Sequence, residues 1–493
     1  MRIPLRCGRW FLLTISAACL AMPFSAADRP DADRPNVLLI AVDDMRVELG
    51  CYGAPIVRSP NLDKLAARSL LFERAYCQQA LCNPSRASLL TGLKIDTLQI
   101  YGLPTHFRER FPDVVTLPQL FKQARYETHG IGKIFHNFRQ DDWKGDARSW
   151  SSPQILHYGN HNKDFADVAG DLPADPISIP RAEAFDVPDD AYWDGKIADA
   201  AVRKLGEIKD EPFFLAVGFW KPHLPFNAPA KYWDLYDPAD VSMPANPLPP
   251  DDVPPIALHE GNELMRDFET GPLPEEVRTL RHGYLAAISY VDAQIGKVLD
   301  EVDRLGLRDD TIVAFWSDHG FHLGEHSLWC KNSNFEWDAR VPMMISVPGQ
   351  ATAGKRTRAL CELLDLYPTL ADYCGLTAPD HLEGISLRPV IEDPAATIRA
   401  CALTQNPRPA YGGRGEDPKI MGYSIRTETH RYTQWRDFRT GDVLAAELYD
   451  HRRDPLETVN EVGNEALTKI VERHQALLNQ AVSRPVTEKR KRK

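Results

Sequence analysis

Continuous apolar segments and amphipathic segments alternate along this chain. Four short apolar runs rich in β-branched and aromatic residues lie at 36–42, 213–218, 311–316 and 341–347. Such runs are typical of strands that are buried on both faces of a parallel sheet. Apolar residues then recur at steps of three and four from Tyr284 to Leu305, and Gly306 follows, which predicts a helix that ends there. The alternation predicts an α/β protein with a large, mostly parallel sheet flanked by helices.

The composition of the chain changes near residue 395. Beyond that point, two short antiparallel strands are predicted at 422–427 and 431–435, and a helix at 463–480. We therefore expect an N-terminal α/β domain over 28–395 and a smaller C-terminal α+β domain over 396–493, which ends in a basic tail. Within the first domain, residues 237–255 are rich in proline and acidic residues, which predicts a long surface loop.

The first 27 residues have the features of a secretory signal peptide. Three arginines precede an apolar stretch from Trp10 to about Met22, and Ser25 and Ala27 supply the small residues of a cleavage site. The apolar stretch is too short to span a membrane, and no span is predicted in the rest of the chain. A lipid anchor on Cys19 is a less favoured alternative. We therefore expect an exported protein, periplasmic or extracellular.

Composition and charge exclude several classes of protein. Of the 493 residues, 43% are hydrophobic and 26% charged, which excludes a disordered chain. The formal net charge of −11 argues against a nucleic-acid-binding protein, and an anionic substrate would need a local cluster of cations. Seven of the nine cysteines lie outside the predicted signal peptide. An odd number in an exported protein means that at least one thiol is unpaired or chemically special.

Acidic residues follow two of the predicted strands. Asp43 and Asp44 come directly after the run at 36–42, and Asp318 and His319 follow the run at 311–316. Ligand sites of open α/β sheets lie at the carboxyl ends of the strands, and adjacent carboxylates there repel each other unless a cation joins them. A pair of helix N-caps is the alternative for the first two residues. Two such clusters favour a metal site, although the histidine leaves the identity of the metal open.

The segment from Cys82 to Gly92 reads C-x-P-S-R-x-x-x-L-T-G. This pattern resembles the signature of the sulfatases, in which a maturation enzyme oxidises the cysteine to formylglycine. Every fixed position matches, although Leu93 stands where a basic residue usually follows the glycine. The alternative for Cys82 is a buried structural thiol.

The resemblance extends over about residues 35–475 and is strongest to the iduronate 2-sulfatase branch. It is carried by the stretches 132–136, 221–226, 324–326, 331–335, 419–426 and 447–450. It implies an alkaline-phosphatase-like sulfatase fold, with the catalytic site in 28–395. It also implies that one Ca²⁺ is held by Asp43, Asp44, Asp318, His319 and the formylglycine made from Cys82. The remaining pocket residues that it implies are Arg86, Lys133, His136, His223 and Lys331.

These residues suit the hydrolysis of a sulfate ester. Fixed cations such as Arg86, Lys133, Lys331 and the metal stabilise charge that develops in the transition state. A hydroxyl of the hydrated formylglycine attacks sulfur, His223 protonates the departing sugar oxygen, and His136 helps to deprotonate the second hydroxyl. The resemblance implies a sulfated saccharide as substrate, most specifically a 2-O-sulfated uronic acid at a chain end. The chain differs from that branch at position 332, where Asn332 replaces an aromatic residue. It also differs in the loops 140–190 and 237–270.

Two other functions stay open at this point. A phosphomonoester or phosphonate ester hydrolase shares the same fold, although the complete cysteine signature argues against it. A non-catalytic protein that binds sulfated glycans would need no convertible cysteine. A second metal held by His322, Glu325 and His326 is a further, less favoured alternative, since glycines interrupt the segment.

Overall fold

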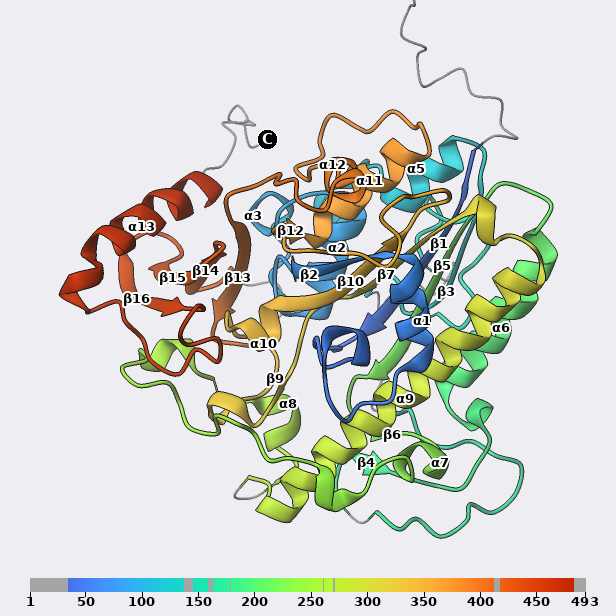
Figure 1. Cartoon of the computed structure of the whole chain (residues 1–493), viewed down its shortest axis with the longest axis horizontal. Coiled ribbons are helices and arrows are strands. Elements are labelled where there is room, and N and C mark those ends of the chain that lie inside the picture. Colours follow the sequence, from blue (N-terminus) through green and yellow to red (C-terminus); the bar gives the residue numbers. More distant parts are fainter. Residues whose placement is uncertain are drawn as a thin grey trace, which may run out of the picture.

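The structure is a computed structural model of the whole chain (Figure 1). It describes residues 34–136, 145–157, 163–177, 179–259, 261–268, 271–411 and 417–482. The predicted signal peptide and the basic end of the tail lie outside the described residues. None of the helices in the described ranges is both long and apolar enough to cross a membrane.

The central sheet has the order β11-β2-β10-β7-β1-β5-β3, with β12 paired to β2. Its strands are β1 (Asn36–Asp43), β2 (Leu70–Tyr76), β3 (Glu127–Gly132), β5 (Phe213–Pro222), β7 (Thr311–Ser317), β10 (Arg340–Ser346), β11 (Arg356–Thr357) and β12 (Cys361–Glu362). All four apolar runs of the sequence are therefore strands. β1 lies between β5 and β7 and is parallel to both. Consequently, the residues that follow β1 and β7 meet at one edge of the sheet.

One strand departs from the expected direction. β10 is antiparallel to both of its neighbours, β7 and β2. Its buried pattern is nevertheless as apolar as that of β1, because both faces of the sheet are covered along its whole width. Burial on both faces determines the apolar composition of a strand, whereas its direction depends on the connection that precedes it.

Helices cover both faces of this sheet (Figure 1). The longer helices are α1 (Pro60–Arg68), α2 (Cys82–Thr91), α5 (Leu117–Gln123), α6 (Trp193–Ile208), α9 (Pro274–Arg304) and α11 (Leu366–Tyr373). Alternate residues of β1 point to opposite faces, so Leu38 and Ile40 pack with α1, α6 and α9, whereas Val37 and Leu39 pack with α2, α5 and α11. Both layers of core thus depend on the same central strand.

The predicted helix before Gly306 is α9, and it is longer than its periodic segment. It begins at Pro274, a residue favoured at the first helical position, and the Glu276 side chain accepts the Leu273 N–H at its start. Shorter helices are α3 (Ile95–Leu98), α4 (Phe107–Arg110), α7 (Ala230–Trp233), α8 (Asn262–Met265), α10 (Glu336–Ala339) and α12 (Arg388–Glu392). The predicted loop at 237–255 contains only short 3₁₀ turns.

The C-terminal part contains a four-stranded antiparallel sheet with one helix packed on it (Figure 1). Its elements are β13 (Ala402–Arg408), β14 (Ile420–Arg426), β15 (His430–Asp437), β16 (Val443–Asp450) and α13 (Thr468–Val482). β14 and β15 are the two predicted strands, and α13 is the predicted helix. The sequence analysis missed β13 and β16, since β13 ends in polar residues and β16 starts with exposed Val443 and Leu444. The domain boundary at 395/396 stays a prediction.

A buried ion-pair network joins the two parts. The Arg431 guanidinium of β15 lies 2.7 Å from Glu457 Oε1 and 2.5 Å from Glu336 Oε2, and Glu336 is the first residue of α10. His451 Nε2 lies 2.8 Å from the same Glu457 oxygen. Burial would raise the pKa of Glu457, but Arg431 and His451 lower it to about 2. The side chains of Glu336, His451 and Glu457 lie close enough together to hold a metal ion, but here Arg431 supplies the positive charge.

Replacement of Arg431 by methionine should strongly destabilise the protein. The variant leaves the Glu457 carboxylate buried without its arginine and leaves Glu336 with Arg426 alone, which costs about 3–5 kcal/mol in comparable sites. Urea unfolding followed by fluorescence measures the change in the free energy of unfolding. The matched control is Arg453→Met, because Arg453 also pairs with two carboxylates but is 64% exposed, so its loss should cost less than about 1 kcal/mol. Equal losses in the two variants would contradict the assignment.

Candidate active site

Three buried carboxylates gather where β1 and β7 end. Asp43 is the last residue of β1, Asp44 follows it, and Asp318 follows the end of β7. The Asp44 N–H donates to Asp318 Oδ1 at 3.1 Å, so the two strand ends are joined directly. Asp44 has a φ of 64°, a left-handed conformation that strains a non-glycine residue and is common at functional sites. All three side chains are shielded from solvent.

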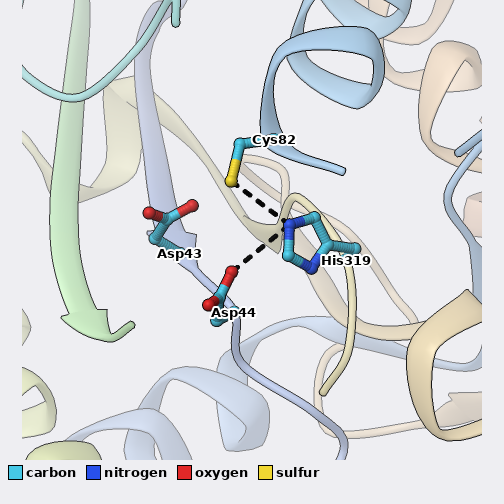
Figure 2. A group of neighbouring side chains, drawn as sticks. All are labelled: Asp43, Asp44, Cys82 and His319. Carbon is cyan, nitrogen blue, oxygen red and sulfur yellow. Dashed lines mark hydrogen bonds and ion pairs between the residues drawn. The ribbon is translucent and has the colours of Figure 1, made fainter. Parts of the chain in front are cut away.

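Cys82 faces these carboxylates from the start of α2 (Figure 2). Its Sγ lies 3.4 Å from His319 Nε2, which in turn lies 3.3 Å from Asp44 Oδ1. Ligand atoms of Asp43, Asp44, Cys82 and His319 lie within 4.8 Å of one another. Several carboxylate oxygens on one small cavity are the donors that hard divalent cations prefer, so this residue set fits a metal ion.

The thiol of Cys82 is poorly suited to act as a nucleophile itself. Burial raises its pKa well above 9.0, and the neighbouring Asp43 adds to this, although Lys133 and Lys331 oppose it. The thiolate is the reactive form of cysteine, and here it is suppressed. An unmodified Cys82 is therefore a neutral thiol in a site crowded with charge.

The Arg86 side chain forms ion pairs with two of the acidic residues, Asp43 and Asp318. It lies one helical turn after Cys82 on α2, and its Nε donates to Asp318 Oδ2 at 2.8 Å. One terminal nitrogen lies 3.2 Å from Asp43 Oδ1, and the other donates to the Lys133 carbonyl oxygen at 2.6 Å. The side chain is fully buried. Arg86 was expected among the cations that stabilise the transition state, and in the structure its guanidinium contacts two carboxylates and a backbone carbonyl oxygen.

Lys133 reaches the site from the end of β3. Its Nζ lies 2.5 Å from Asp43 Oδ2, and its backbone N–H donates to the Gly218 carbonyl oxygen at 2.7 Å. A Cβ atom at Gly218 would lie 1.9 Å from the Lys133 carbonyl oxygen, so glycine is required for this close approach of β3 and β5. His136 follows three residues later and is buried, and burial and Lys133 lower its pKa well below 6.5.

Lys331 and His223 complete the opposite side. Lys331 Nζ lies 2.9 Å from Asp44 Oδ2. Burial alone would lower the pKa of Lys331, but Asp44 and other acidic groups raise it well above 10.5, so the side chain is a cation. His223 Nε2 lies 3.7 Å from Asp44 Oδ2, and burial and Lys331 lower the pKa of this imidazole. The predicted site residues therefore lie around one group of carboxylates. For His136 this position stays a prediction.

Comparison with known proteins agrees with this geometry. The model of the sulfatase family matches residues 35–376, and that of the C-terminal region of N-sulphoglucosamine sulphohydrolase matches residues 324–484. The chain belongs to the sulfatase family. The resemblance drawn from the cysteine signature is thus confirmed.

This sulfatase is similar to several curated relatives over most of its length. It is 36% identical to iduronate 2-sulfatase of Mus musculus, over 91% of this chain and 95% of the relative. It is 31% identical to a sulfatase of Formosa agariphila, over 91% and 87% of the two chains. The crystal structure of a phosphonate monoester hydrolase of Agrobacterium radiobacter is 24% identical and superposes with a TM-score of 0.74, over 91% and 95% of the chains. That likeness confirms the expected fold.

One residue of the sulfatase site was missed by the sequence analysis. Glu263 of α8 places Oε1 3.1 Å from His223 Nε2 and Oε2 3.2 Å from Lys331 Nζ. Burial would raise the pKa of Glu263, but Lys331 and His223 lower it, so the residue is a carboxylate. It lies in the loop 237–270, which differs from the related branch, but no motif marks it. Its carboxylate thus contacts both the Lys331 cation and the His223 ring.

The alternative of a second metal at His322 is not supported. His322 Nδ1 lies 2.6 Å from Asp338 Oδ1, and its Nε2 lies 3.2 Å from His326 Nδ1. His326 Nε2 in turn lies 2.8 Å from the Leu456 carbonyl oxygen. The ring nitrogens are thus used within the protein, and the residues form no candidate metal group among those that the structure describes.

The cysteine count is also explained in part. Among the cysteines within the described ranges, no two are joined by a disulfide. The odd number predicted at least one thiol without a disulfide partner, and Cys82 of the sulfatase site is such a thiol.

The metal-free sulfatase should lose stability as the pH rises from about 4 to about 7. Burial raises the pKa of Asp44 from 3.8 to about 7, so the folded protein binds more protons than the unfolded chain between these values. Stability therefore falls across this window, by an amount on the order of a few kcal/mol. Urea unfolding of chelator-treated protein measures the slope. Asp44→Asn should flatten it, and identical slopes for both proteins would contradict the prediction.

Proposed function

We propose that this sulfatase removes sulfate from sulfated saccharides, and most specifically from a 2-O-sulfated uronic acid at a chain end. The observation that carries the proposal is the convergence of Cys82, the strand-end acidic residues and two buried lysines in one site. The likeness to iduronate 2-sulfatase supports the choice of sugar. Asn332 and the loops around Glu263 are the places where this chain departs from that branch.

We further propose that Cys82 is converted to formylglycine by a maturation enzyme and that the site binds one Ca²⁺. The ion would be held by Asp43, Asp44, Asp318, His319 and the converted residue 82, which supply mainly hard oxygen ligands. When these groups are present, the metal and the hydrated aldehyde supply an activated hydroxyl for attack on sulfur. Conversion also removes the disadvantage of a buried, neutral thiol.

The two lysines bind and orient the sulfate group. Lys133 and Lys331 approach from different elements, β3 and the loop after β9 (Trp329–Cys330), and each now pairs with one aspartate. A cation in a desolvated site stabilises negative charge much more than it does in water. The same two side chains therefore counter the charge of the ester and the charge that develops as the S–O bond to the sugar breaks.

Two histidines handle protons in the proposed reaction. His223 has a carbonyl oxygen of Leu224 2.5 Å from Nδ1 and Glu263 3.1 Å from Nε2. Both partners are acceptors, and the bond to Glu263 opposes the lowering of the pKa of His223 by burial and Lys331. The ring makes both hydrogen bonds only when it carries two protons, and in that form it can protonate the departing sugar oxygen. The lowered pKa of His136 keeps its ring neutral, and a neutral imidazole accepts a proton.

The place of action is part of the same proposal. The features of residues 1–27 support export to the periplasm or the extracellular space, where sulfated polysaccharides are found. Nucleic acids are not expected as partners, because the net charge of −11 repels a polyanion. The basic tail at 489–493 has no role in this proposal.

Sulfate release tests the proposed reaction directly. We expect protein co-expressed with a maturation enzyme to release sulfate from terminal 2-O-sulfated uronates, measured by ion chromatography. Hexosamine sulfates and algal galactan and fucan sulfates complete the panel, and Cys82→Ala, which should lose more than about 1,000-fold in rate, is the control.

The outcomes separate the rival functions. Release from another sugar keeps the sulfatase and moves the specificity to the loops. No release from protein whose mass shows the aldehyde would argue for a phosphonate ester or phosphomonoester substrate, or for binding alone.

Removal of the metal tests the cofactor. Chelator-treated protein should lose sulfate release and melt at a lower temperature, because the three buried carboxylates then lack their divalent cation. Calcium at about 100 times its Kd should restore activity and add about 2.7 kcal/mol of stability. Differential scanning calorimetry and the sulfate assay measure the two effects. Restoration by magnesium and not by calcium would contradict the assigned ion.

A further inference from the structure

A cavity of about 490 Å³ is lined in part by residues that follow His223 and Glu263 closely in the chain. Its wall includes Pro225, two residues after His223, and Cα atoms two residues apart lie within about 7 Å of each other. The wall also includes Arg266 at the end of α8, three residues after Glu263 and on the same side of that helical turn. Two separate elements thus each supply one residue to the sulfatase site and another to the cavity.

The cavity has the size and position of a sugar subsite. Ligand pockets commonly have volumes of about 300–1,000 Å³. Its floor is the short parallel sheet of β4 (Ala182–Glu183) and β6 (Phe226–Asn227), and β6 directly continues the segment that carries His223. In Figure 1 both strands lie with α8 in the lower part of the molecule. A saccharide whose sulfated end unit meets His223 would place its next unit toward this sheet.

An exposed aromatic ring on a rigid anchor lines the cavity. Phe165 is 58% exposed, which is unusual for a side chain of this size in an ordered segment. The preceding residue, Asp164, forms a buried ion pair of 2.6 Å with Lys221. The following residue, Ala166, donates its N–H to Glu183 Oε1 at 2.9 Å. Fixed from both sides, the ring offers a flat apolar face that suits the C–H face of a sugar ring.

Two arginines flank this ring. Arg181 Nε lies 2.5 Å from Asp267 Oδ2, and its side chain is only 14% exposed. Arg266 lies 4.0 Å from the same Asp267 oxygen, and its side chain is 56% exposed. The short pair with Arg181 engages the carboxylate, so Arg266, which also lines the cavity, is held only loosely by Asp267. Guanidinium groups bind carboxylates and sulfates through paired hydrogen bonds.

We propose that this cavity is a second subsite, which binds the sugar unit next to the one that loses its sulfate. The proposal rests on the proposed function and adds the chemistry of that neighbouring unit. Phe165 stacks against its ring, and Arg266 binds a carboxylate or sulfate that it carries. The preferred substrate is therefore an acidic oligosaccharide rather than a sulfated monosaccharide, and binding in the second subsite raises kcat/KM for the longer molecule.

The experiment compares three substrates on matured protein. They are an acidic disaccharide with a sulfated terminal unit, the corresponding sulfated monosaccharide, and 4-nitrophenyl sulfate. Phe165→Ala and Arg266→Ala should each lower kcat/KM for the disaccharide about tenfold and change the other two substrates less than about twofold. Lys64→Ala, at an exposed lysine of a different cavity, is the matched control and should change none of them. A fourth substrate, a disaccharide with a neutral second unit, should show no dependence on Arg266 and keep the dependence on Phe165.

Equal losses on all three substrates, or no loss on the disaccharide, would overturn the subsite. Failure of the proposed function is recognised separately, since 4-nitrophenyl sulfate would then be cleaved without release from any saccharide. In that case, calorimetric titration of the Cys82→Ala protein with the unsulfated acidic disaccharide decides the matter. Binding that weakens about tenfold in a Cys82→Ala, Arg266→Ala double variant supports the subsite. Undetectable binding to the Cys82→Ala protein contradicts it.

Discussion

The structure depends on a concentration of like charge at the carboxyl edge of one strand. Asp43, Asp44 and Asp318 are all buried, and the Asp44 N–H donates to the Asp318 carboxylate. Burial alone would favour the neutral forms of these side chains. Each therefore has a cation from another element: Lys133 for the first, Lys331 for the second and Arg86 for the third. These pairs join β3, α2 and the segment after β9 to the end of the central sheet. The three carboxylates are thus matched one for one by three buried side-chain cations.

The parts of the fold that sequence predicts are those in which one cause dominates. β1 and β7 are apolar along their length because both of their faces are covered. The signature at Cys82 is a short contiguous motif, so it can be recognised without knowledge of distant contacts. The direction of β10 depends instead on a connection through two small strands, β8 (His322–Leu323) and β9, and on α10, which leaves no mark on the composition of β10 itself. In the same way, β13 is buried by contacts that polar residues make, and apolar patterns do not detect it.

The site shows the same division between local and long-range causes. Asp43, Asp44, Cys82 and Asp318 were found because strand ends and a contiguous motif mark them. The contacts of Arg86 could not be predicted from the motif. The spacing places Arg86 near Cys82, but it does not give the direction of the guanidinium, which contacts the Asp318 carboxylate and the Lys133 carbonyl oxygen. Glu263 lies on the four-residue helix α8, and only the three-dimensional approach of α8 to His223 and Lys331 reveals it.

Catalysis and substrate choice are built on different kinds of element. The residues proposed to carry the chemistry include those at the ends of long buried strands and at the start of α2, where packing on both faces fixes them. The cavity beside His223 is instead lined by short elements, which are held by a few polar contacts such as the buried pair of Lys221 with Asp164. Lys221 lies two residues before His223, and Asp164 directly precedes Phe165. This single ion pair therefore links the segment that carries His223 to the segment that carries Phe165. Changes of loop sequence around that pair can therefore alter which saccharide fits while the carboxylate edge of the sheet keeps its geometry.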